Sequence, residues 1–326
     1  MPKQIAIVGA GVSGLTCGVL FTERGYRVSI FAAEIEQQTT SAAAAAIWYP
    51  YDAGPADKVI ARALETYKLL VDLSQDAQSG VSMIELRTFS RAGEIQIPDW
   101  AHALGAKLLS DVAIVLCAVP NRPQAGAYKF KSGFTLNVPL MDTTIYLDYL
   151  AKRFAAAGGS LKANAHFDKL EDVDLAFDLV INCAGIGAKT LVQDVDLEPH
   201  RGQVAIVPKI DNLSCAIVSD DAPLMYAIPR ANDCVFGGTN DLSEGRRVDP
   251  AATARVVAEC SRVLNIERPK VLAERVGLRP FRKSGVRLER DKLRDGRVVI
   301  HNYGHGGAGF TLSWGCAQEV VDFARA

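Results

Sequence analysis

The sequence predicts an α/β fold in which a domain built on a parallel sheet is joined to a second, mostly antiparallel β domain. The first observation is a short apolar run at residues 5–8 that leads directly into Gly9-Ala-Gly-Val-Ser-Gly14 and a helical pattern of apolar residues. The second is another strand pattern at residues 27–31. The third is a succession of short strand patterns in the middle of the chain, which lacks the regular βαβ alternation of a parallel sheet.

The glycine motif between the first strand and the first helix predicts a dinucleotide-binding site. In a G-x-G-x-x-G turn, Gly9 permits the tight turn, Gly11 lets the backbone approach a pyrophosphate, and Gly14 lets the helix pack closely on the strand. An ordinary glycine-rich turn is the alternative, but the order of strand, motif and helix favours the nucleotide. Glu34, twenty residues after Gly14, is placed to bind ribose hydroxyls, which favours FAD or NAD over NADP. A solvated acid is the alternative for Glu34.

The remaining elements follow in order and set the expected domains. Asp142 and Asp249 are good N-caps for two of the helices, the second with Pro250 in its first turn. We expect helices at 57–73, 143–156, 250–264 and from 311 onward, and strands at 82–88, 112–118, 134–138, 161–165, 178–181, 204–207, 216–219, 225–228, 235–238, 271–278 and 298–301. These patterns predict a discontinuous nucleotide-binding domain of residues 1–50, 140–200 and 270–326, with residues 51–139 and 201–269 forming the second domain.

Composition narrows the function. With 326 residues the chain is long enough for two domains, and 36 basic against 37 acidic residues give no basic excess for nucleic acid or a membrane surface. No apolar run reaches the length of a membrane span, and the N-terminus enters a strand too soon for a signal peptide. Seven scattered cysteines show neither disulfide nor metal spacing. We therefore expect a soluble, cytoplasmic protein with a small-molecule partner and no metal.

A run of hydroxyls and small residues follows the second strand. Thr39, Thr40 and Ser41 precede five alanines at 42–46, and then come Ile47 and Trp48-Tyr-Pro-Tyr51. Small side chains let a flat group pack against the backbone, and the hydroxyls are suited to phosphate or ribityl oxygens. A plain helix start, with Ser41 as its N-cap, is the alternative, and the two are compatible.

Three further segments are candidates for chemistry. Arg279, in Gly277-Leu-Arg-Pro280, would clamp a carboxylate through two parallel hydrogen bonds, or it forms a structural ion pair. Tyr226 would add a hydrogen bond to the same group, or it is a half-buried core tyrosine. Gly304–Gly309 forms either a second backbone cradle or a plain turn at the start of the last helix. No hydrolytic constellation is present, and His301 and His305 straddle a glycine, so the reaction is expected to belong to a cofactor.

These motifs together resemble the D-amino-acid oxidase family. The resemblance rests on Arg287-Leu-Glu-Arg290 followed by His301-Asn-Tyr-Gly-His-Gly-Gly307, with Gly277-Leu-Arg-Pro280, Arg201-Gly-Gln203, Asn182-Cys183 and the segment from Thr39 to Tyr51 in the same order, so that it spans nearly the whole chain. It implies a glutathione-reductase-like, Rossmann-type FAD-binding domain with a second β-rich substrate domain.

The resemblance also implies a set of site residues. Arg279 and Tyr226 would hold the substrate carboxylate, the Gly307 carbonyl would accept from the α-amino group, and Tyr49 would wall the side-chain pocket. His166 would meet the adenine through its backbone. The predicted cofactor-binding residues are Gly9, Ala10, Gly11, Val12, Ser13, Gly14, Glu34, Thr39, Thr40, Ser41, Ala44, Ala45, Ala46, Ile47, His166, Gly185, Arg279, Gly306, Gly307, Gly309, Phe310 and Thr311.

The reaction that the resemblance implies is the FAD-dependent oxidation of neutral D-amino acids to 2-oxo acids, ammonia and hydrogen peroxide. Hydride passes from the α-carbon to the flavin and oxygen reoxidises it, with no side chain acting as acid or base. A D-aspartate oxidase or a glycine- or sarcosine-type amine oxidase is the alternative, and an NAD-linked dehydrogenase or a flavin-binding protein without turnover is a more distant one. The partners are a D-amino acid and oxygen, and the oligomeric state stays open, with a homodimer as one candidate.

Departures from the family pattern bear on the substrate. Ala222 replaces a tyrosine on a lid over the site, and Tyr49 replaces a glutamine. The positions that carry extra arginines in D-aspartate oxidases are matched to Ser219 and Asn240, which supply no cation. A buried carboxylate without a partner is costly, so neutral side chains are favoured. Arg230, close to Tyr226 in the chain, is the remaining cation whose orientation the sequence leaves open.

Overall fold

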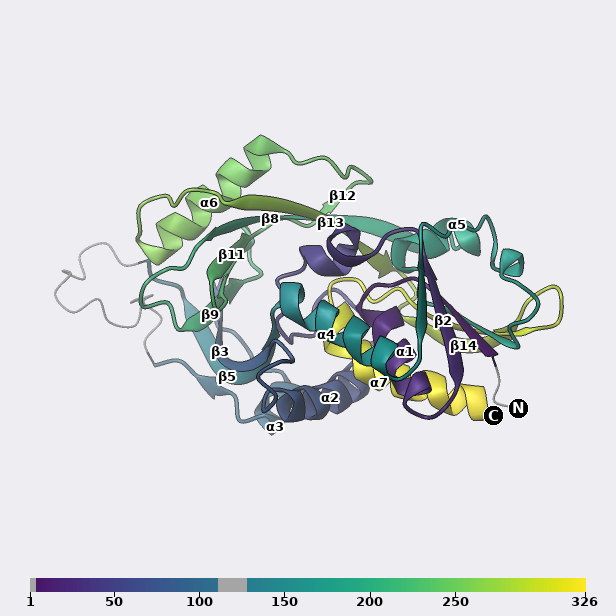
Figure 1. Cartoon of the computed structure of the whole chain (residues 1–326). Coiled ribbons are helices and arrows are strands. Elements are labelled where there is room, and N and C mark those ends of the chain that lie inside the picture. Colours follow the sequence, from purple (N-terminus) through teal and green to yellow (C-terminus); the bar gives the residue numbers. More distant parts are fainter. Residues whose placement is uncertain (1–3, 111–127) are drawn as a thin grey trace.

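A six-stranded, mostly parallel sheet organises the N- and C-terminal parts of the chain (Figure 1). The structure, a computed structural model, describes residues 4–110 and 128–326. The sheet has the order β14-β15-β7-β1-β2-β6, in which neighbouring strands are parallel except for β14 and β15. Its strands are β1 (Gln4–Val8), β2 (Arg27–Ala32), β6 (Ser160–Ala163), β7 (Leu179–Asn182), β14 (Arg287–Lys292) and β15 (Val298–Tyr303).

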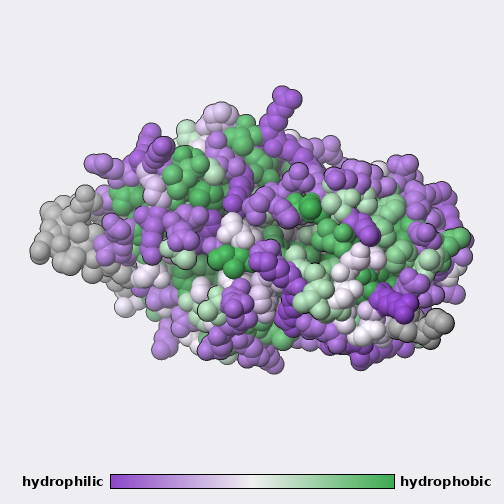
Figure 2. Space-filling model, viewed as in Figure 1, coloured by the Kyte–Doolittle hydropathy of each residue, from purple (hydrophilic) through white to green (hydrophobic). Residues whose placement is uncertain are grey.

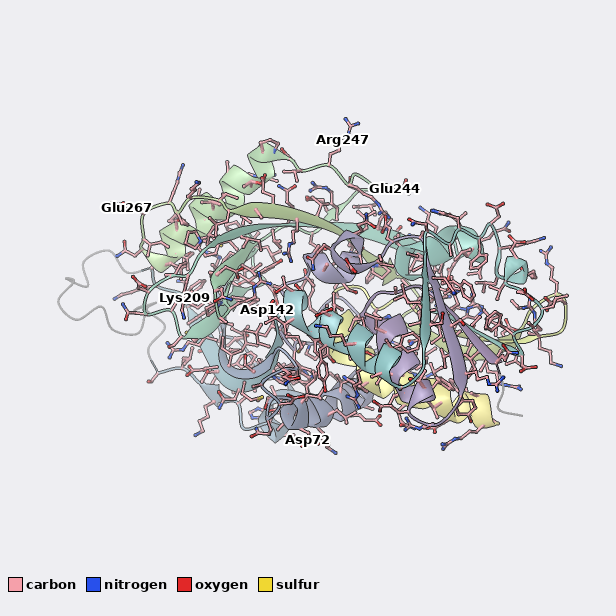
Figure 3. The ribbon with its side chains drawn as sticks, in the orientation of Figure 1. Asp72, Asp142, Lys209, Glu244, Arg247 and Glu267 are labelled. Carbon is pink, nitrogen blue, oxygen red and sulfur yellow. The ribbon has the colours of Figure 1, made fainter. Side chains whose placement is uncertain are left out.

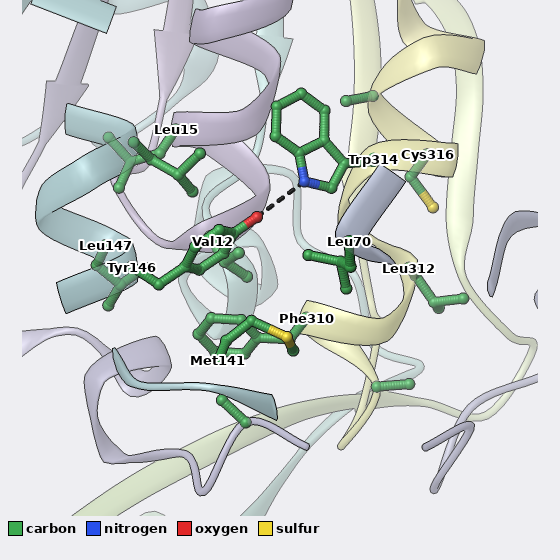
Figure 4. Close-up of a cluster of buried hydrophobic side chains, with 14 of the residues drawn as sticks. Val12, Leu15, Leu70, Met141, Tyr146, Leu147, Phe310, Leu312, Trp314 and Cys316 are labelled. Atoms are coloured by element: carbon green, nitrogen blue, oxygen red, sulfur yellow. Dashed lines mark hydrogen bonds between the residues drawn. The ribbon is translucent and has the colours of Figure 1, made fainter. Parts of the chain in front are cut away.

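Other parts of the chain cover both faces of this sheet. Alternate residues of each strand point to opposite faces, so each face has its own cluster of buried side chains. Ile5 and Ile7 of β1 face the core formed with the helices, whereas Ala6 and Val8 pack in a smaller cluster with Leu170. The helices are α1 (Val12–Thr22), α2 (Ala56–Leu73), α4 (Thr143–Ala156) and α7 (Gly309–Arg325). In their shared core, the Trp314 indole donates to the Tyr146 hydroxyl at 2.8 Å, so two large buried side chains satisfy each other (Figure 4).

A second, nine-stranded sheet forms the other part of the molecule. Its order is β12-β8-β11-β10-β9-β3-β5-β4, and β13 pairs with β8. All its pairs are antiparallel except the parallel pair of β3 and β9. The strands are β3 (Val81–Ser90), β4 (Lys107–Leu108), β5 (Ser132–Met141), β8 (Leu197–Pro208), β9 (Cys215–Ser219), β10 (Met225–Pro229), β11 (Asp233–Gly237), β12 (Asp241–Leu242) and β13 (Ala273–Arg282).

Helix α6 (Pro250–Leu264) covers the outer face of this sheet (Figure 1). Ala205 and Val207 pack beneath it, while Val204 and Ile206 of the same strand join the main core on the inner face. As expected for an N-cap, Asp249 accepts a hydrogen bond from the Ala251 amide at 2.9 Å. The short elements are α3 (Asp99–Ala103), α5 (Ala188–Leu191) and the 3₁₀ helices Glu36–Gln38, Thr40–Ala43, Leu170–Asp172 and Gly185–Gly187.

Two expectations need correction. Strand β13, predicted at 271–278 within a piece of the nucleotide-binding domain, belongs to the nine-stranded sheet, because it continues across β8 for ten residues. The five alanines do not start a helix capped by Ser41: a short 3₁₀ helix, Thr40–Ala43, is capped by Thr39, which accepts from the Ala42 amide, and Ala44 is extended. The predicted strand at 112–118 lies outside the described residues. The division into domain pieces stays a prediction.

The surface agrees with the balanced composition. Figure 2 shows hydrophilic residues around the outline of one face, with hydrophobic patches between them. Charged side chains extend outward, as Glu244 and Arg247 do from the loop between β12 and α6 (Figure 3), and Glu244 forms an ion pair with Lys189 at 2.9 Å. Among residues 4–110 and 128–326, no helix is both long enough and apolar enough to cross a membrane.

Candidate active site

Two adjoining cavities contain the residues singled out from the sequence. One faces the inner side of the nine-stranded sheet and spans about 1240 Å³, including space that is open to solvent. The other, of about 1150 Å³, lies at the carboxyl ends of β1 and β2. Thr40, Cys183, Gly185 and Pro280 line both cavities, which therefore form one continuous cleft. We call the first the inner cavity and the second the nucleotide cavity.

The glycine turn at the nucleotide cavity leaves no room for side chains. Gly9 has φ of 111°, and a Cβ there would lie 2.3 Å from the Cys183 carbonyl oxygen. A Cβ on Gly14 would lie 1.9 Å from the Gly9 carbonyl oxygen. The Ser41 hydroxyl accepts from the Val12 amide at 3.0 Å, which ties the hydroxyl run to the first turn of α1. This geometry keeps the backbone of the turn open to a pyrophosphate.

The far rim of the nucleotide cavity carries an exposed ion pair. Glu34 and Arg246 both line the cavity, and their side chains are bonded to each other. Arg246 belongs to the loop between β12 and α6, so a segment far away in the sequence reaches the carboxylate predicted to hold a ribose. His166 also lines this cavity and is exposed.

Most of the predicted cofactor residues line the two cavities. Those along the inner cavity are Ser13, Thr40, Ser41, Ala44, Ala45, Ala46, Ile47, Gly185, Arg279, Gly306, Gly307, Gly309 and Phe310. Those along the nucleotide cavity are Gly9, Ala10, Gly11, Glu34, Thr39, Thr40, His166 and Gly185. Val12, Gly14 and Thr311 line neither. The Thr311 hydroxyl is 1% exposed and exchanges hydrogen bonds with the Tyr49 backbone, at 3.0 Å in each direction.

The cleft fits a flavin dinucleotide. Close backbone packing at the turn requires glycine at Gly9 and Gly14, and the wall at residues 43–47 is made of four alanines and an isoleucine. Opposite them, Gly306 has φ of 52° and a Cβ there would lie 1.8 Å from the Asp52 carbonyl oxygen. Only small residues permit this close approach, and they leave a flat space beside α7.

Two glycines on the nine-stranded sheet make room for Arg279 and Tyr226. A Cβ on Gly202 would lie 2.4 Å from a guanidinium nitrogen of Arg279, and a Cβ on Gly237 would lie 1.9 Å from Cζ of Tyr226. Arg279 donates to the Thr239 carbonyl at 3.1 Å and to Asn240 Oδ1 at 3.0 Å through Nη1, and no carboxylate pairs with it among the described residues. It is therefore a positioned cation at the inner cavity with its charge uncompensated.

Three tyrosines line the inner cavity: Tyr49, Tyr51 and Tyr226. Burial raises the pKa of Tyr51 to about 12, with Arg279 opposing the rise and Asp220 adding to it. Burial likewise raises the pKa of Tyr226 and of Tyr49, and in Tyr49 the Asp220 charge adds to the effect. All three phenols therefore stay protonated at neutral pH.

Asp220 is the residue of this cavity that the sequence reasoning missed. It lines the wall directly after β9, and Tyr49 donates to it at 3.5 Å. Desolvation raises the pKa of its carboxyl. Because strand residues alternate, the side chains of Val218 and Asp220 point to the inner cavity, whereas Ser219, matched to a family arginine position, packs on the other face. The signal available in the sequence was an acidic residue directly after the strand predicted at 216–219.

The other cations near the cavity are neutralised or absent from its lining. The side chain of Arg230 is 2% exposed and bonds to both carboxylate oxygens of Asp233, at 2.7 and 2.8 Å. Asn240 is occupied by Arg279. Ala222 is exposed, and from that segment it is Leu224 that lines the cavity. Arg279 is thus the one cation among the residues that line the inner cavity.

A group of buried polar side chains lies on β15, directly after it and on the neighbouring β7, and Asn302 and His305 of this group line the inner cavity. His305 Nε2 bonds to Asn302 at 3.0 Å, and His301 Nδ1 to Asn182 at 3.2 Å. Burial lowers the pKa of both histidines to about 4, and a nearby arginine, Arg62 or Arg287, adds to the effect. Both rings are therefore neutral at neutral pH. Among the described residues, no group of histidine, cysteine, aspartate and glutamate is arranged to hold a metal ion.

Comparison with known proteins assigns a class to this cleft. Residues 4–323 match the family described as FAD dependent oxidoreductase. The chain is 37% identical to the D-amino-acid oxidase of Rubrobacter xylanophilus, with 99% of this chain and 96% of that one covered. It is 36% identical to the D-amino-acid oxidase of Streptomyces coelicolor, over 98% and 96% of the two chains.

The chain belongs to the D-amino-acid oxidase family of FAD-dependent oxidoreductases. FAD is accordingly its cofactor, as the sequence predicted. Among solved structures, the glycine oxidase of Geobacillus kaustophilus superposes with a TM-score of 0.81 at 18% identity, covering 99% of this chain and 95% of that one. That likeness shows the shared fold, and it confirms the predicted α/β architecture with its second β domain.

Proposed function

We propose that this protein oxidises neutral D-amino acids with oxygen to imino acids and hydrogen peroxide, and that water then hydrolyses the imino acids to 2-oxo acids and ammonia. The observation that carries the proposal is Arg279, a cation without a carboxylate partner among the described residues, which lies against Gly202 on the wall of the inner cavity. Relatives at 36 and 37% identity are named D-amino-acid oxidases. When bound, FAD would take up the hydrogen and electron pair from the substrate α-carbon and pass the electrons to oxygen.

The residues of the inner cavity would bind and orient the substrate. The Arg279 guanidinium would hold the carboxylate through two parallel hydrogen bonds, and the Tyr226 hydroxyl would donate a third. The Gly307 carbonyl would accept from the α-amino group. With these contacts the α-carbon is held in one orientation, and such positioning is a large part of the rate enhancement that a protein can provide.

No side chain is required to remove a proton from the α-carbon. The tyrosines of the cavity have pKa values raised by burial, so they donate hydrogen bonds and do not act as bases at neutral pH. Ile47, Leu224 and Ile228 supply apolar walls to this space. A neutral side chain is favoured because Arg279, the one cation among the lining residues, is engaged by the substrate carboxylate.

The test is oxygen consumption by the purified protein with a panel of D- and L-amino acids, D-aspartate, glycine and sarcosine. Turnover of neutral D-amino acids with equimolar peroxide supports the proposal. Preference for D-aspartate would indicate a D-aspartate oxidase instead, and preference for glycine or sarcosine would indicate a glycine- or sarcosine-type amine oxidase. A yellow protein inactive across the panel would indicate a flavin-binding protein without turnover or a changed substrate.

We also propose a cytoplasmic location. The six cysteines within the described residues are buried free thiols, as is usual in a reducing compartment. Cell fractionation tests this, and recovery outside the cytoplasm would reject it. The homodimer stays a prediction, which light scattering on the purified protein would check.

A further inference from the structure

The inner cavity holds charges of both signs. Arg279 lies against Gly202, and Asp220 lines the same cavity after β9. Tyr51 experiences both charges, since the Arg279 guanidinium lowers its pKa and the Asp220 carboxylate raises it. The two charged groups therefore face a common space. They do not form an ion pair with each other, and the Asp220 carboxylate has Tyr49 as its hydrogen-bond donor, at 3.5 Å.

The cavity that Asp220 lines also has apolar walls. Val218, Leu224 and Ile228 supply aliphatic surface, and Tyr49 and Tyr51 supply aromatic surface. Tyr49 packs edge-on against Trp100, with 6.1 Å between ring centres, which fixes the phenol that reaches Asp220. Asp220 follows β9 directly, and more than one third of the residue is exposed to solvent.

We propose that Asp220 selects substrates by the charge of their side chain, excluding anionic D-amino acids and extending the range from neutral to cationic ones such as D-lysine. This inference rests on the proposed function and names the residue that sets its limits. A substrate whose carboxylate is bound by Arg279 has its side chain in a cavity whose one lining carboxylate is Asp220. A side-chain ammonium gains an attractive partner there, and a side-chain carboxylate meets a like charge.

The experiment compares substrates that differ by one charged group. For the wild type and Asp220→Asn, kcat/KM is measured for D-lysine against D-norleucine and for D-glutamate against D-glutamine. Asparagine keeps an acceptor for Tyr49 and removes only the charge. We expect the D-lysine to D-norleucine ratio to fall about tenfold and the D-glutamate to D-glutamine ratio to rise by a similar factor, as for a charge pair at a partly exposed site.

Asp221→Asn is the matched control, because it removes the same charge one residue away. Asp221 is not part of the cavity lining and is bonded to Ser90 and to the backbone amides of Arg91 and Ala92. This variant should leave both substrate ratios at their wild-type values. Equal changes in the two variants would reduce the effect to general surface charge and overturn the proposal.

Two other results would also overturn it. Unchanged ratios in Asp220→Asn would show that the carboxylate does not meet the side chain. An equal fall in kcat/KM for all four substrates would indicate that Asp220 contacts the substrate α-amino group or stabilises the fold. Both results leave D-norleucine oxidation by the wild type intact, so they are distinct from a failure of the proposed function.

A binding measurement keeps the inference testable without turnover. The flavin absorbance of the holoenzyme is titrated with 6-aminohexanoate and with hexanoate, which share the carboxylate and differ in the distal ammonium. We expect Asp220→Asn to weaken 6-aminohexanoate relative to hexanoate about tenfold. Equal affinity changes for the two ligands would contradict the assignment of Asp220 to the side-chain pocket.

Discussion

The two cavities of this cleft are lined by different kinds of groups. The nucleotide cavity is formed around the backbone of Gly9–Gly11 at the carboxyl ends of β1 and β2, and residues 31–34, 165–167 and 183–187 and Arg246 also line it. The opposite wall of the inner cavity is formed by the side chains of Tyr49, Asp220, Tyr226 and Arg279, which come from the loop after the alanine run and from three parts of the nine-stranded sheet. Substitutions should therefore act on cofactor retention in one region and on substrate selection in the other.

The largest effect should separate the two regions directly. Arg279→Ala removes the carboxylate partner and leaves the glycine turn untouched, so the protein should stay yellow while kcat/KM for a good D-amino acid falls about thousandfold, or ~4 kcal/mol. Arg279→Lys is the control for charge without two parallel donors and should be intermediate. The measurements are the flavin spectrum and steady-state oxygen uptake. Near-normal kinetics in Arg279→Ala would contradict the assignment of Arg279 to the substrate carboxylate.

The converse substitution acts on the nucleotide cavity. Gly14→Ala places a Cβ 1.9 Å from the Gly9 carbonyl oxygen, so helix and turn must separate. We expect FAD affinity to fall about a hundredfold, near the ~3 kcal/mol upper range for overpacking. Gly93→Ala is the control, since Gly93 lines neither cavity and a Cβ there meets nothing within 4 Å. Equal flavin content in the two variants would contradict the role of the glycine turn.

The buried histidines on β15 and directly after it should make stability depend on pH. His301 and His305 have pKa values near 4 in the folded protein, against 6.5 for an unperturbed histidine. Between these values the unfolded chain binds protons that the folded chain does not, so the unfolding free energy falls as pH falls, by about 3 kcal/mol per residue. Urea unfolding from pH 7 to 4 measures this, and His305→Gln should reduce the slope. Constant stability over this range would contradict the burial argument.

A substitution at Gly202, which packs against the Arg279 guanidinium, should have a smaller effect on substrate binding. Gly202→Ala places a Cβ within 2.4–2.6 Å of the guanidinium, whose flexible side chain must shift. We expect KM to rise about tenfold with flavin content unchanged. Gly93→Ala, where a Cβ meets nothing within 4 Å, is the control. An unchanged KM in Gly202→Ala would show that the position of Arg279 does not depend on this contact.

The smallest effect concerns the rim of the nucleotide cavity. Arg246 and Glu34 form an ion pair with side chains 53% and 43% exposed. Exposed pairs contribute about 0–1 kcal/mol, so Arg246→Ala should weaken FAD binding by no more than about fivefold. Fluorescence titration of the apoprotein with FAD measures this. A loss as large as that of Gly14→Ala would show that the arginine itself binds the nucleotide.

The sequence by itself determined the parallel sheet, the cofactor class and the family. The strand at Gln4–Val8, the glycine turn and α1 are contiguous, so local periodicity and the steric need for glycine are readable without a fold. Arg279 and Tyr226 were found through motifs in single segments, and the structure brings both to the inner cavity. Their roles, like those of the other site residues, stay predictions until the variants are measured.

Only the tertiary structure decided which side chains share the inner cavity. The assignment of β13 to the nine-stranded sheet depends on its register with β8, which no local pattern encodes. The pairing of Glu34 with Arg246 joins residues on different segments. Asp220, and not Ser219, lines the inner cavity because side chains alternate along β9, and this could be stated only once the inner face of β9 was known. These facts depend on long-range packing, since a strand's inner face is defined only by the elements that cover it.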